Sequence, residues 1–315
     1  MLRKSSWFLV VSLVVATLLL AACASSSTTS NPGAPSVSGV PAFPVTIDAA
    51  NGRVTLDAMP ARVVSISPTA TEMLFAVGAG DQVVAVDSYS NYPVNAPTTD
   101  LSAYEPNVEA IASYEPDLVV YSNDPGDLQK SLDKLHIPAL LQPAAATIDD
   151  VYAQMQDLGL ATGHVEQAQT QVDDLTAQIA TVGASVGEAG ADMTYYYELD
   201  DTYYSVTSDT FIGNLFSLLG LENIADEAKG ASSGYPQLSA EYILAADPSM
   251  ILLADTKCCG QNADTVARRP GWKDLSAVAD GAVVELDDDV ASRWGPRVID
   301  LLQQVADTVQ EQATS

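Results

Sequence analysis

The sequence is poor in cationic residues. It has 13 Lys and Arg against 41 Asp and Glu in 315 residues, which gives a formal net charge of −28. A chain this acidic repels phosphate backbones, so the composition argues against nucleic-acid binding. It also argues mildly against small anionic ligands, although exported proteins are often acidic for solubility alone.

Histidine is scarce too, and the chain has only His136 and His164. The string 183–187 (Gly-Ala-Ser-Val-Gly) matches the nucleophile elbow of hydrolases, which needs a strand before the serine and a later histidine. Here a helical pattern precedes Ser185 and no histidine follows. No phosphate-binding loop of the Gly-x-x-x-x-Gly-Lys type occurs. We therefore expect no enzyme activity, no catalytic residue, no cofactor and no protein-held metal.

Cysteine is limited to three residues, and two of them, Cys258 and Cys259, are adjacent. A disulfide between neighbours is strained but possible, and two free thiols are unusual in an exported protein, so we favour the disulfide. Zinc is disfavoured because the pair lacks a spacer and a nearby histidine. The acidic run 287–289 lacks the alternating spacing of a calcium loop, and a solvated turn is the better interpretation.

Only the N-terminus carries a long apolar run. Arg3 and Lys4 precede an apolar stretch over 7–22, which is typical of a secretory signal peptide. The run ends in Leu-Ala-Ala-Cys23, which resembles the lipobox of bacterial lipoproteins. That resemblance implies cleavage before Cys23 and acylation of its sulfur and amino group; the alternative is an ordinary cleavage site with an incidental cysteine. Residues 23–44 are rich in Ser, Thr, Pro and Gly and indicate a flexible linker.

The next part of the chain alternates between strand and helix patterns. Residues 45–61 predict a hairpin, with Asn51-Gly52 near its turn. In residues 62–146, β-rich and helical runs follow one another at 62–67, 68–78, 82–86, 108–114, 117–121, 128–135 and 139–142. This alternation predicts a parallel sheet covered by helices.

Residues 147–190 interrupt the alternation with two helical patterns. Thr147 and Asp150 form a capping-box signal for a helix to about Ala161. The second helical pattern is a stripe of apolar residues spaced three or four positions apart, at Val165, Ala168, Val172, Leu175, Ile179, Val182 and Val186. It predicts a helix of about 33 Å that joins two lobes. Residues 191–315 form the second lobe, with strands expected at 193–199, 250–253 and 282–285 and helices at 211–219 and 296–310.

The two halves also resemble each other. Residues 109–120 and 241–252 each contain a Glu, a helical stretch, an acidic residue before proline, and then a strand pattern. Chance similarity is the alternative, but a duplicated, two-lobed molecule explains the match better.

Several motifs resemble the solute-binding proteins of ABC importers, in the subfamily for cobalamin and ferric siderophores. They occur in order along roughly 62–311, at 62–72, 86–93, 107–111, 115–121, 221–225, 235–244 and 292–298. The resemblance implies two α/β lobes with central sheets, joined by one long helix, and a ligand held in the cleft between them.

The same resemblance implies one docking glutamate on each lobe, which contacts arginines of the permease dimer. By position these are Glu109 and Glu241. The alternative for each is an exposed acidic residue favoured by a helix N-terminus.

Cleft candidates also follow from the resemblance. They are Tyr89, Tyr104, Tyr235, Asp289 and Arg293, of which Asp289 and Arg293 match polar groups that face corrin amides in the cobalamin-binding relative. The alternative for each tyrosine is a structural role in the core or at the rim. The alternative for Arg293 is an ion pair with residues 287–289 that holds its own loop. The first lobe lacks the tryptophans of that relative, which argues against cobalamin. Arginine is also scarce in these loops, so a neutral or hydroxamate-type ligand fits better than an anionic catecholate complex.

We therefore expect an extracytoplasmic, lipid-anchored and monomeric solute-binding protein. Its ligand would be a corrinoid such as cobalamin or a ferric-siderophore-type iron complex, which it would deliver to an ABC transporter permease. The alternatives are a sensor or structural lipoprotein without transport, and an extracellular hydrolase.

Overall fold

The computed structural model describes residues 41–314. The expected signal peptide, Cys23 and most of the expected linker lie outside these residues. Among residues 41–314, none of the helices is both long and apolar enough to cross a membrane.

The strands occur in three groups along the chain. They are β1 (Val45–Ala49), β2 (Gly52–Leu56), β3 (Val63–Ile66), β4 (Val83–Asp87), β5 (Thr98–Leu101), β6 (Leu118–Tyr121), β7 (Ala139–Leu141), β8 (Thr194–Glu198), β9 (Glu222–Asn223), β10 (Met250–Leu253) and β11 (Val283–Glu285).

Helices alternate with these strands. They are α1 (Pro68–Ala76), α2 (Val108–Ala112), α3 (Leu128–Lys134), α4 (Ile148–Thr162), α5 (Val165–Val186), α6 (Phe211–Ser217), α7 (Ala240–Ala246), α8 (Thr256–Cys259), α9 (Ala263–Ala267), α10 (Ser276–Ala279), α11 (Asp288–Ala291) and α12 (Val298–Thr314), with short 3-10 turns at Gly80–Gln82, Pro125–Asp127, Ala231–Ser233 and Trp272–Asp274.

The two larger sheets are parallel and share one topology, which confirms the α/β expectation. The first-lobe sheet has the order β5-β4-β3-β6-β7, and the second-lobe sheet has the order β11-β10-β8-β9. Read from the opposite edge, β9-β8-β10-β11 matches β4-β3-β6-β7 strand for strand. The internal similarity seen in the sequence is therefore also a similarity of fold.

The turn of the antiparallel hairpin β1–β2 contacts one edge of the first-lobe sheet. Asn51, at its turn, donates from Nδ2 to the carbonyl of Ala139 (2.8 Å) and accepts from the amide of Leu141 (3.2 Å). Both partners belong to the edge strand β7. One side chain thus satisfies two backbone groups that a further strand would otherwise pair.

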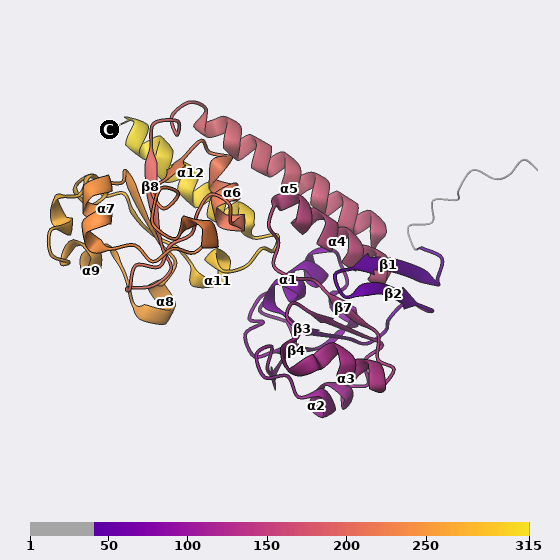
Figure 1. Ribbon diagram of the computed structural model, residues 1–315. Helices are drawn as coiled ribbons and strands as arrows, with labels where there is room; N and C mark the ends of the chain where they lie inside the picture. Colours follow the sequence, from indigo (N-terminus) through magenta and orange to yellow (C-terminus); the bar gives the residue numbers. More distant parts are fainter. Residues whose placement is uncertain (1–40, 315) are drawn as a thin grey trace, which may run out of the picture. The chain divides into compact units, whose positions relative to one another are not determined.

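Helices α4 and α5 link the two lobes (Figure 1). The expected capping box of Thr147 and Asp150 starts α4. Helix α5 has the expected bounds, and it packs against α4 and against α12 of the second lobe. Its apolar stripe is buried from Ala168 onward, but Val165 is 40% exposed because it begins the first turn.

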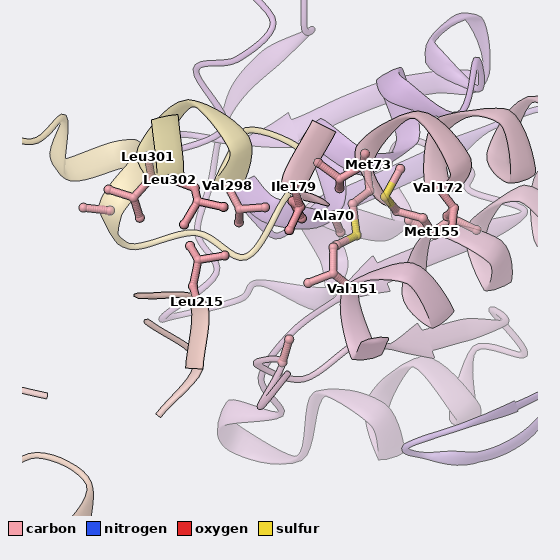
Figure 2. Close-up of a cluster of buried hydrophobic side chains, with 14 of the residues drawn as sticks. Ala70, Met73, Val151, Met155, Val172, Ile179, Leu215, Val298, Leu301 and Leu302 are labelled. Atoms are coloured by element: carbon pink, nitrogen blue, oxygen red, sulfur yellow. The ribbon is translucent and has the colours of Figure 1, made fainter. Parts of the chain in front are cut away.

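One hydrophobic core runs through both lobes. Figure 2 shows side chains of α1, α4, α5, α6 and α12 in one cluster, including Met73, Met155, Ile179, Leu215 and Leu302. Such continuous packing resists bending between the lobes. Residues at the carboxyl ends of strands in both sheets line cavities between the lobes.

Candidate ligand-binding cleft

Two cavities lie where residues of both lobes meet. The first measures about 230 Å³ and the second about 220 Å³, and residues 292–294 line both. The first is bordered mainly by loops of the first lobe and the second mainly by the second lobe. We call the two cavities together the cleft.

The first cavity has a polar floor that comes from the ends of parallel strands. Ser67 follows β3, Asp87 ends β4, and Ser122 follows β6, and all three line this cavity. Parallel strands end at the same edge of a sheet, so residues far apart in sequence meet there. Ser122 Oγ donates to Ser67 Oγ (2.6 Å), and Ser67 in turn caps α1 by accepting from the amide of Ala70.

Asp87 is buried at this floor. It accepts hydrogen bonds from the hydroxyl of Ser90 (2.6 Å) and the backbone amide of Tyr89 (2.8 Å). Burial raises the pKa of its carboxyl above the ordinary value, and these two hydrogen bonds partly offset that rise. Asp87 therefore positions the loop that carries Tyr89.

The three candidate tyrosines all lie at the cleft and are exposed. Tyr89 and Tyr104 line the first cavity, and Tyr235 lines the second. They are 57%, 71% and 57% exposed, which excludes the core alternative for each. Tyr89 and Tyr104 meet edge to face with ring centroids 5.7 Å apart. Aromatic faces thus stand on both sides of the cleft.

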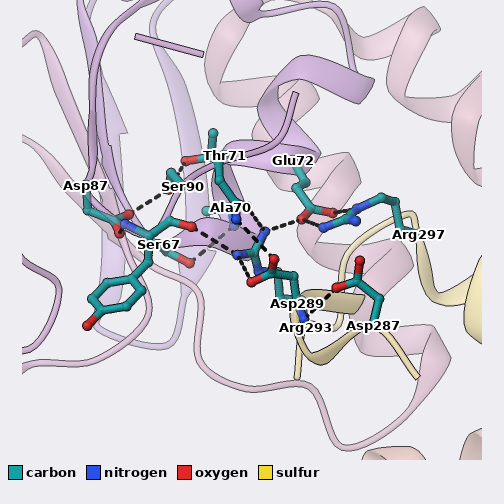
Figure 3. A network of polar contacts seen from close by, with 12 residues as sticks. Ser67, Ala70, Thr71, Glu72, Asp87, Ser90, Asp287, Asp289, Arg293 and Arg297 are labelled. Carbon is teal, nitrogen blue, oxygen red and sulfur yellow. Dashed lines mark hydrogen bonds and ion pairs between the residues drawn. The ribbon is translucent and has the colours of Figure 1, made fainter. Parts of the chain in front are cut away.

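Arg293 also lines both cavities, but its guanidinium is engaged with the first lobe. Nη1 donates to Glu72 Oε1 (2.8 Å) and Asn91 Oδ1 (3.0 Å), while Nη2 donates to the carbonyl of Tyr89 (2.9 Å) and to Asp289 Oδ1 (2.9 Å). Figure 3 shows Arg293 and Arg297 converging on Glu72. The arginine expected to contact a ligand thus spans the two lobes, and its pairing extends well beyond its own loop.

The acidic run at 287–289 is a hydrogen-bonded turn. Asp288 accepts from the amides of Lys257 and Cys258, and Lys257 Nζ contacts Asp287 and Asp289. Burial raises the pKa of Asp289, but hydrogen bonds from Lys257 and Asn91 and the charge of Arg293 leave it below the ordinary value. Within residues 41–314, no cluster of three or more His, Cys, Asp or Glu has the arrangement of a metal site.

Cys258 and Cys259 are free, exposed thiols in the structure. The disulfide that we expected between them is not formed. Both residues lie in the single helical turn α8, where successive side chains diverge by about 100° around the helix axis.

Glu109 and Glu241 occupy equivalent, exposed positions in the two lobes. Each is the second residue of its helix, α2 or α7, after the capping residue Asn107 or Ser239. Each helix is followed by a residue in the left-handed region before proline, Glu115 (φ 47°) or Asp247 (φ 46°). The paired pattern in the sequence therefore has one local structure in both lobes.

Three further residues of this network, Glu72, Asn91 and Arg297, were not among the site residues predicted from the sequence. Arg297 makes a two-point ion pair with Glu72, at 2.9 Å for Nε to Oε2 and also from Nη2 to Oε1. The available signal was a charged residue inside an otherwise buried helical segment, at Glu72 in α1. Such a residue requires a buried partner.

The comparisons with known proteins agree with this architecture. A family model described as periplasmic binding protein matches residues 63–290. The chain is 30% identical over 274 residues to a cobalamin-binding protein of Halobacterium salinarum, covering 84% of this chain and 74% of the relative. It is 28% identical over 277 residues to an uncharacterised ABC transporter substrate-binding lipoprotein of Bacillus subtilis, covering 85% of this chain and 86% of the relative.

Solved structures show the same fold. The periplasmic vitamin B12 binding protein of Vibrio cholerae aligns with a TM-score of 0.65 at 26% identity, over 81% of this chain and 98% of that one. A possible iron-binding, periplasmic solute-binding protein of Staphylococcus epidermidis aligns with a TM-score of 0.70 at 24% identity, over 80% of this chain and 99% of that one. Taken with the two-lobed geometry, these matches show that the chain belongs to the periplasmic binding protein family and is a solute-binding protein, not an enzyme.

Proposed function

We propose that this protein captures a corrinoid or a ferric-siderophore-type iron complex outside the cytoplasm and delivers it to the permease of an ABC transporter. The observation that carries the proposal is the cleft with exposed tyrosines on both sides. Aromatic faces suit a large ligand with flat apolar surfaces, and the polar floor of Ser67, Asp87 and Ser122 suits its amide groups. The names of the cobalamin-binding and vitamin B12-binding relatives support the same class.

The charges of the cleft favour a neutral ligand. Among the described residues, the charged side chains that line the two cavities are Asp87, Asp289 and Arg293. Arg293 already contacts two carboxylates, Glu72 and Asp289. A strongly anionic catecholate complex would meet no uncompensated cation there, whereas a corrinoid or hydroxamate complex needs none.

The cleft also favours a ligand whose metal is already fully coordinated. Within the described residues, the lining of both cavities contains no His, Cys or Met. The metal would therefore enter as part of the cargo.

A titration tests the ligand class. The full-length protein, purified from membranes, is first analysed by absorbance and mass spectrometry for co-purified ligand. It is then titrated with cyanocobalamin, a ferric hydroxamate and a ferric catecholate. We expect saturable binding of one of the first two and none of the third. Tight binding of the catecholate alone would contradict the charge argument.

Tyr235 provides a prediction for the second-lobe side of the cleft. Tyr235→Ala removes an exposed aromatic face, so we expect the affinity for the bound ligand to fall about tenfold, the equivalent of about 1.4 kcal/mol. Isothermal calorimetry measures the change. Tyr204→Ala is the matched control because Tyr204 is 41% exposed and lines neither cavity. An equal loss in both variants would contradict a cleft role for Tyr235.

The membrane anchor belongs to the same proposal. Cys23 lies outside the described residues, and the lipobox pattern around it supports acylation. We expect Cys23→Ala to release the protein from the membrane fraction or to block its maturation, since about 0.8 kcal/mol is lost per methylene no longer buried. Fractionation with mass spectrometry of the N-terminal peptide checks this. Unchanged membrane association together with an unacylated peptide would contradict it.

A sensor lipoprotein without transport is the second candidate. The exposed, equivalent positions of Glu109 and Glu241 favour transport over this alternative, because two matched carboxylates suit a two-fold partner.

A further inference from the structure

Glu72 is a buried carboxylate with two cationic partners from the other lobe. Its side chain is fully buried, and it receives hydrogen bonds from Arg293 (Nη1 to Oε1, 2.8 Å) and from Arg297 (Nε to Oε2, 2.9 Å). More than 220 residues separate Glu72 from either arginine in the sequence. A buried carboxylate of this kind is stable only while its partners stay in place.

The two arginines also contact the loop that carries Tyr89. Arg293 donates to the carbonyl of Tyr89 (2.9 Å) and to Asn91 Oδ1 (3.0 Å). Arg297 lies over the ring of Tyr92, with 4.3 Å between the guanidinium carbon and the ring centroid. Asn91 Nδ2 in turn donates to Asp289 Oδ2 (3.0 Å). Residues 89–92, which we call the cleft loop, are therefore attached to the second lobe at several points.

The second-lobe end of this network is itself fixed. Asp289 accepts from Arg293 and from Lys257 Nζ (2.9 Å), and Lys257 also contacts Asp287. Arg293 connects this acidic turn to Glu72, and Figure 3 shows its guanidinium between the carboxylates of Asp289 and Glu72. Rotation of one arginine away from Glu72 would leave the buried carboxylate with one cationic partner, and rotation of both would leave it with none.

We propose that Glu72 is a positioning residue of the cleft: its carboxylate orients Arg293 and Arg297, which hold the cleft loop and Tyr89 in place before any ligand arrives. The guanidinium of Arg293 then acts as a link between lobes more than as a receptor for an anionic ligand. Binding is strengthened because the ordering of the loop is complete in the free protein.

Hydrogen–deuterium exchange on the ligand-free, full-length protein tests the proposal. Glu72→Gln keeps the shape of the side chain and removes the charge. We expect backbone amides of residues 88–93 and 292–298 to exchange at least about tenfold faster, while β3 and β10 exchange as before. Glu188→Gln, at an exposed position, is the matched control and should change neither segment. Unchanged exchange in the cleft loop would overturn the proposal, as would an equal acceleration in β3 and β10.

A second variant covers the case in which Glu72→Gln does not fold. Arg297→Gln removes the partner that is 17% exposed and leaves the Arg293 contact. We expect the same local acceleration from Arg297→Gln alone, and unchanged exchange in the cleft loop of this variant would overturn the proposal. Where Glu72→Gln does fold, the double variant should accelerate exchange by less than the product of the two single effects, because both act through one contact. A fully multiplicative effect would overturn the shared role of Glu72.

Affinity supplies a further measurement, which rests on the proposed function. Cyanocobalamin is the probe, and if the wild-type protein binds it, Glu72→Gln should raise the Kd at least about tenfold. An unchanged Kd would overturn the positioning role. If the wild-type protein does not bind cyanocobalamin, the corrinoid part of the proposed function fails on its own, and the exchange experiment still decides whether Glu72 holds the cleft loop.

Discussion

Several ionisable side chains are buried in this molecule, and Asp255 is the one whose carboxyl oxygens lack hydrogen-bond partners among the described residues. It is fully buried between β10 and α8. Burial, followed by the negative charge of Glu198, raises the pKa of Asp255 to about 7, although Arg269 opposes the rise. A carboxyl in this state prefers to keep its proton.

Asp255 therefore predicts a pH dependence of stability. Because the folded-state pKa is raised above the unfolded value near 4, the folded protein binds the extra proton between these values. The contribution of this proton to the free energy of unfolding is fully present below about pH 4. It is lost as the pH rises from there through 7, by up to ~3–5 kcal/mol.

Asp255→Asn should flatten this loss and make the variant the more stable protein at pH 8. Urea unfolding at pH 5 and pH 8 measures it, with the exposed Asp264→Asn as control. A wild-type slope that persists in Asp255→Asn would show that another group titrates.

The residues that form the cleft differ in how well the sequence reveals them. The tyrosines were predictable because they lie in or near segments that resemble family motifs, at 86–93, 107–111 and 235–244. Glu72 and Arg297 were not, since a pair separated by 225 positions leaves no local periodicity. The role of Arg293 was only half predictable: its place at the cleft followed from the motif, but its bonds to the first lobe depend on how the two lobes meet.

At the scale of elements, the long helices were predictable, whereas several short strands and helices were not. Helix α5 follows from its regular apolar spacing, and α4 from its capping box. The short elements β5, β9 and α8–α11 have two to five residues and no periodic signal. Their conformation is set by tertiary contacts such as the bonds of Asp288 to α8.

The contact between α4 and α5 depends on one glycine. A Cβ built on Gly159 would lie 2.3 Å from Cβ of Ala168 and 3.1 Å from the carbonyl of His164. Gly159→Ala should therefore destabilise the protein by ~1–3 kcal/mol, even though alanine favours a helix by ~1 kcal/mol.

Ala168→Gly in the same chain removes the closest clash, so the double variant should recover part of the lost stability. Urea unfolding of the wild type, both single variants and the double variant measures the coupling. Purely additive effects would mean that these two positions do not compete for space.

At the scale of the whole molecule, two similar lobes carry two similar helix starts. Glu109 and Glu241 extend from equivalent positions of α2 and α7, so charge reversal at both should repel basic groups of a permease. We expect Glu109→Lys/Glu241→Lys to reduce ligand uptake by cells at least about tenfold and to leave ligand affinity unchanged.

Uptake assays beside calorimetry of the purified variant separate these two effects. Glu166→Lys/Glu222→Lys reverses two exposed charges elsewhere and is the control. Normal uptake by the double variant at Glu109 and Glu241 would refute the docking role, and reduced affinity would place these residues in binding instead.

The hairpin β1–β2 lines neither cavity, yet its Asn51 has a consequence for how the protein behaves at high concentration. Strand β7 ends the first-lobe sheet, and an uncovered edge strand is a template on which a second chain can add a strand. Asn51 already bonds the carbonyl of Ala139 and the amide of Leu141 there. The turn of this small hairpin thus occupies backbone groups through which a second chain could add a strand, and this limits aggregation through the sheet edge in concentrated solution.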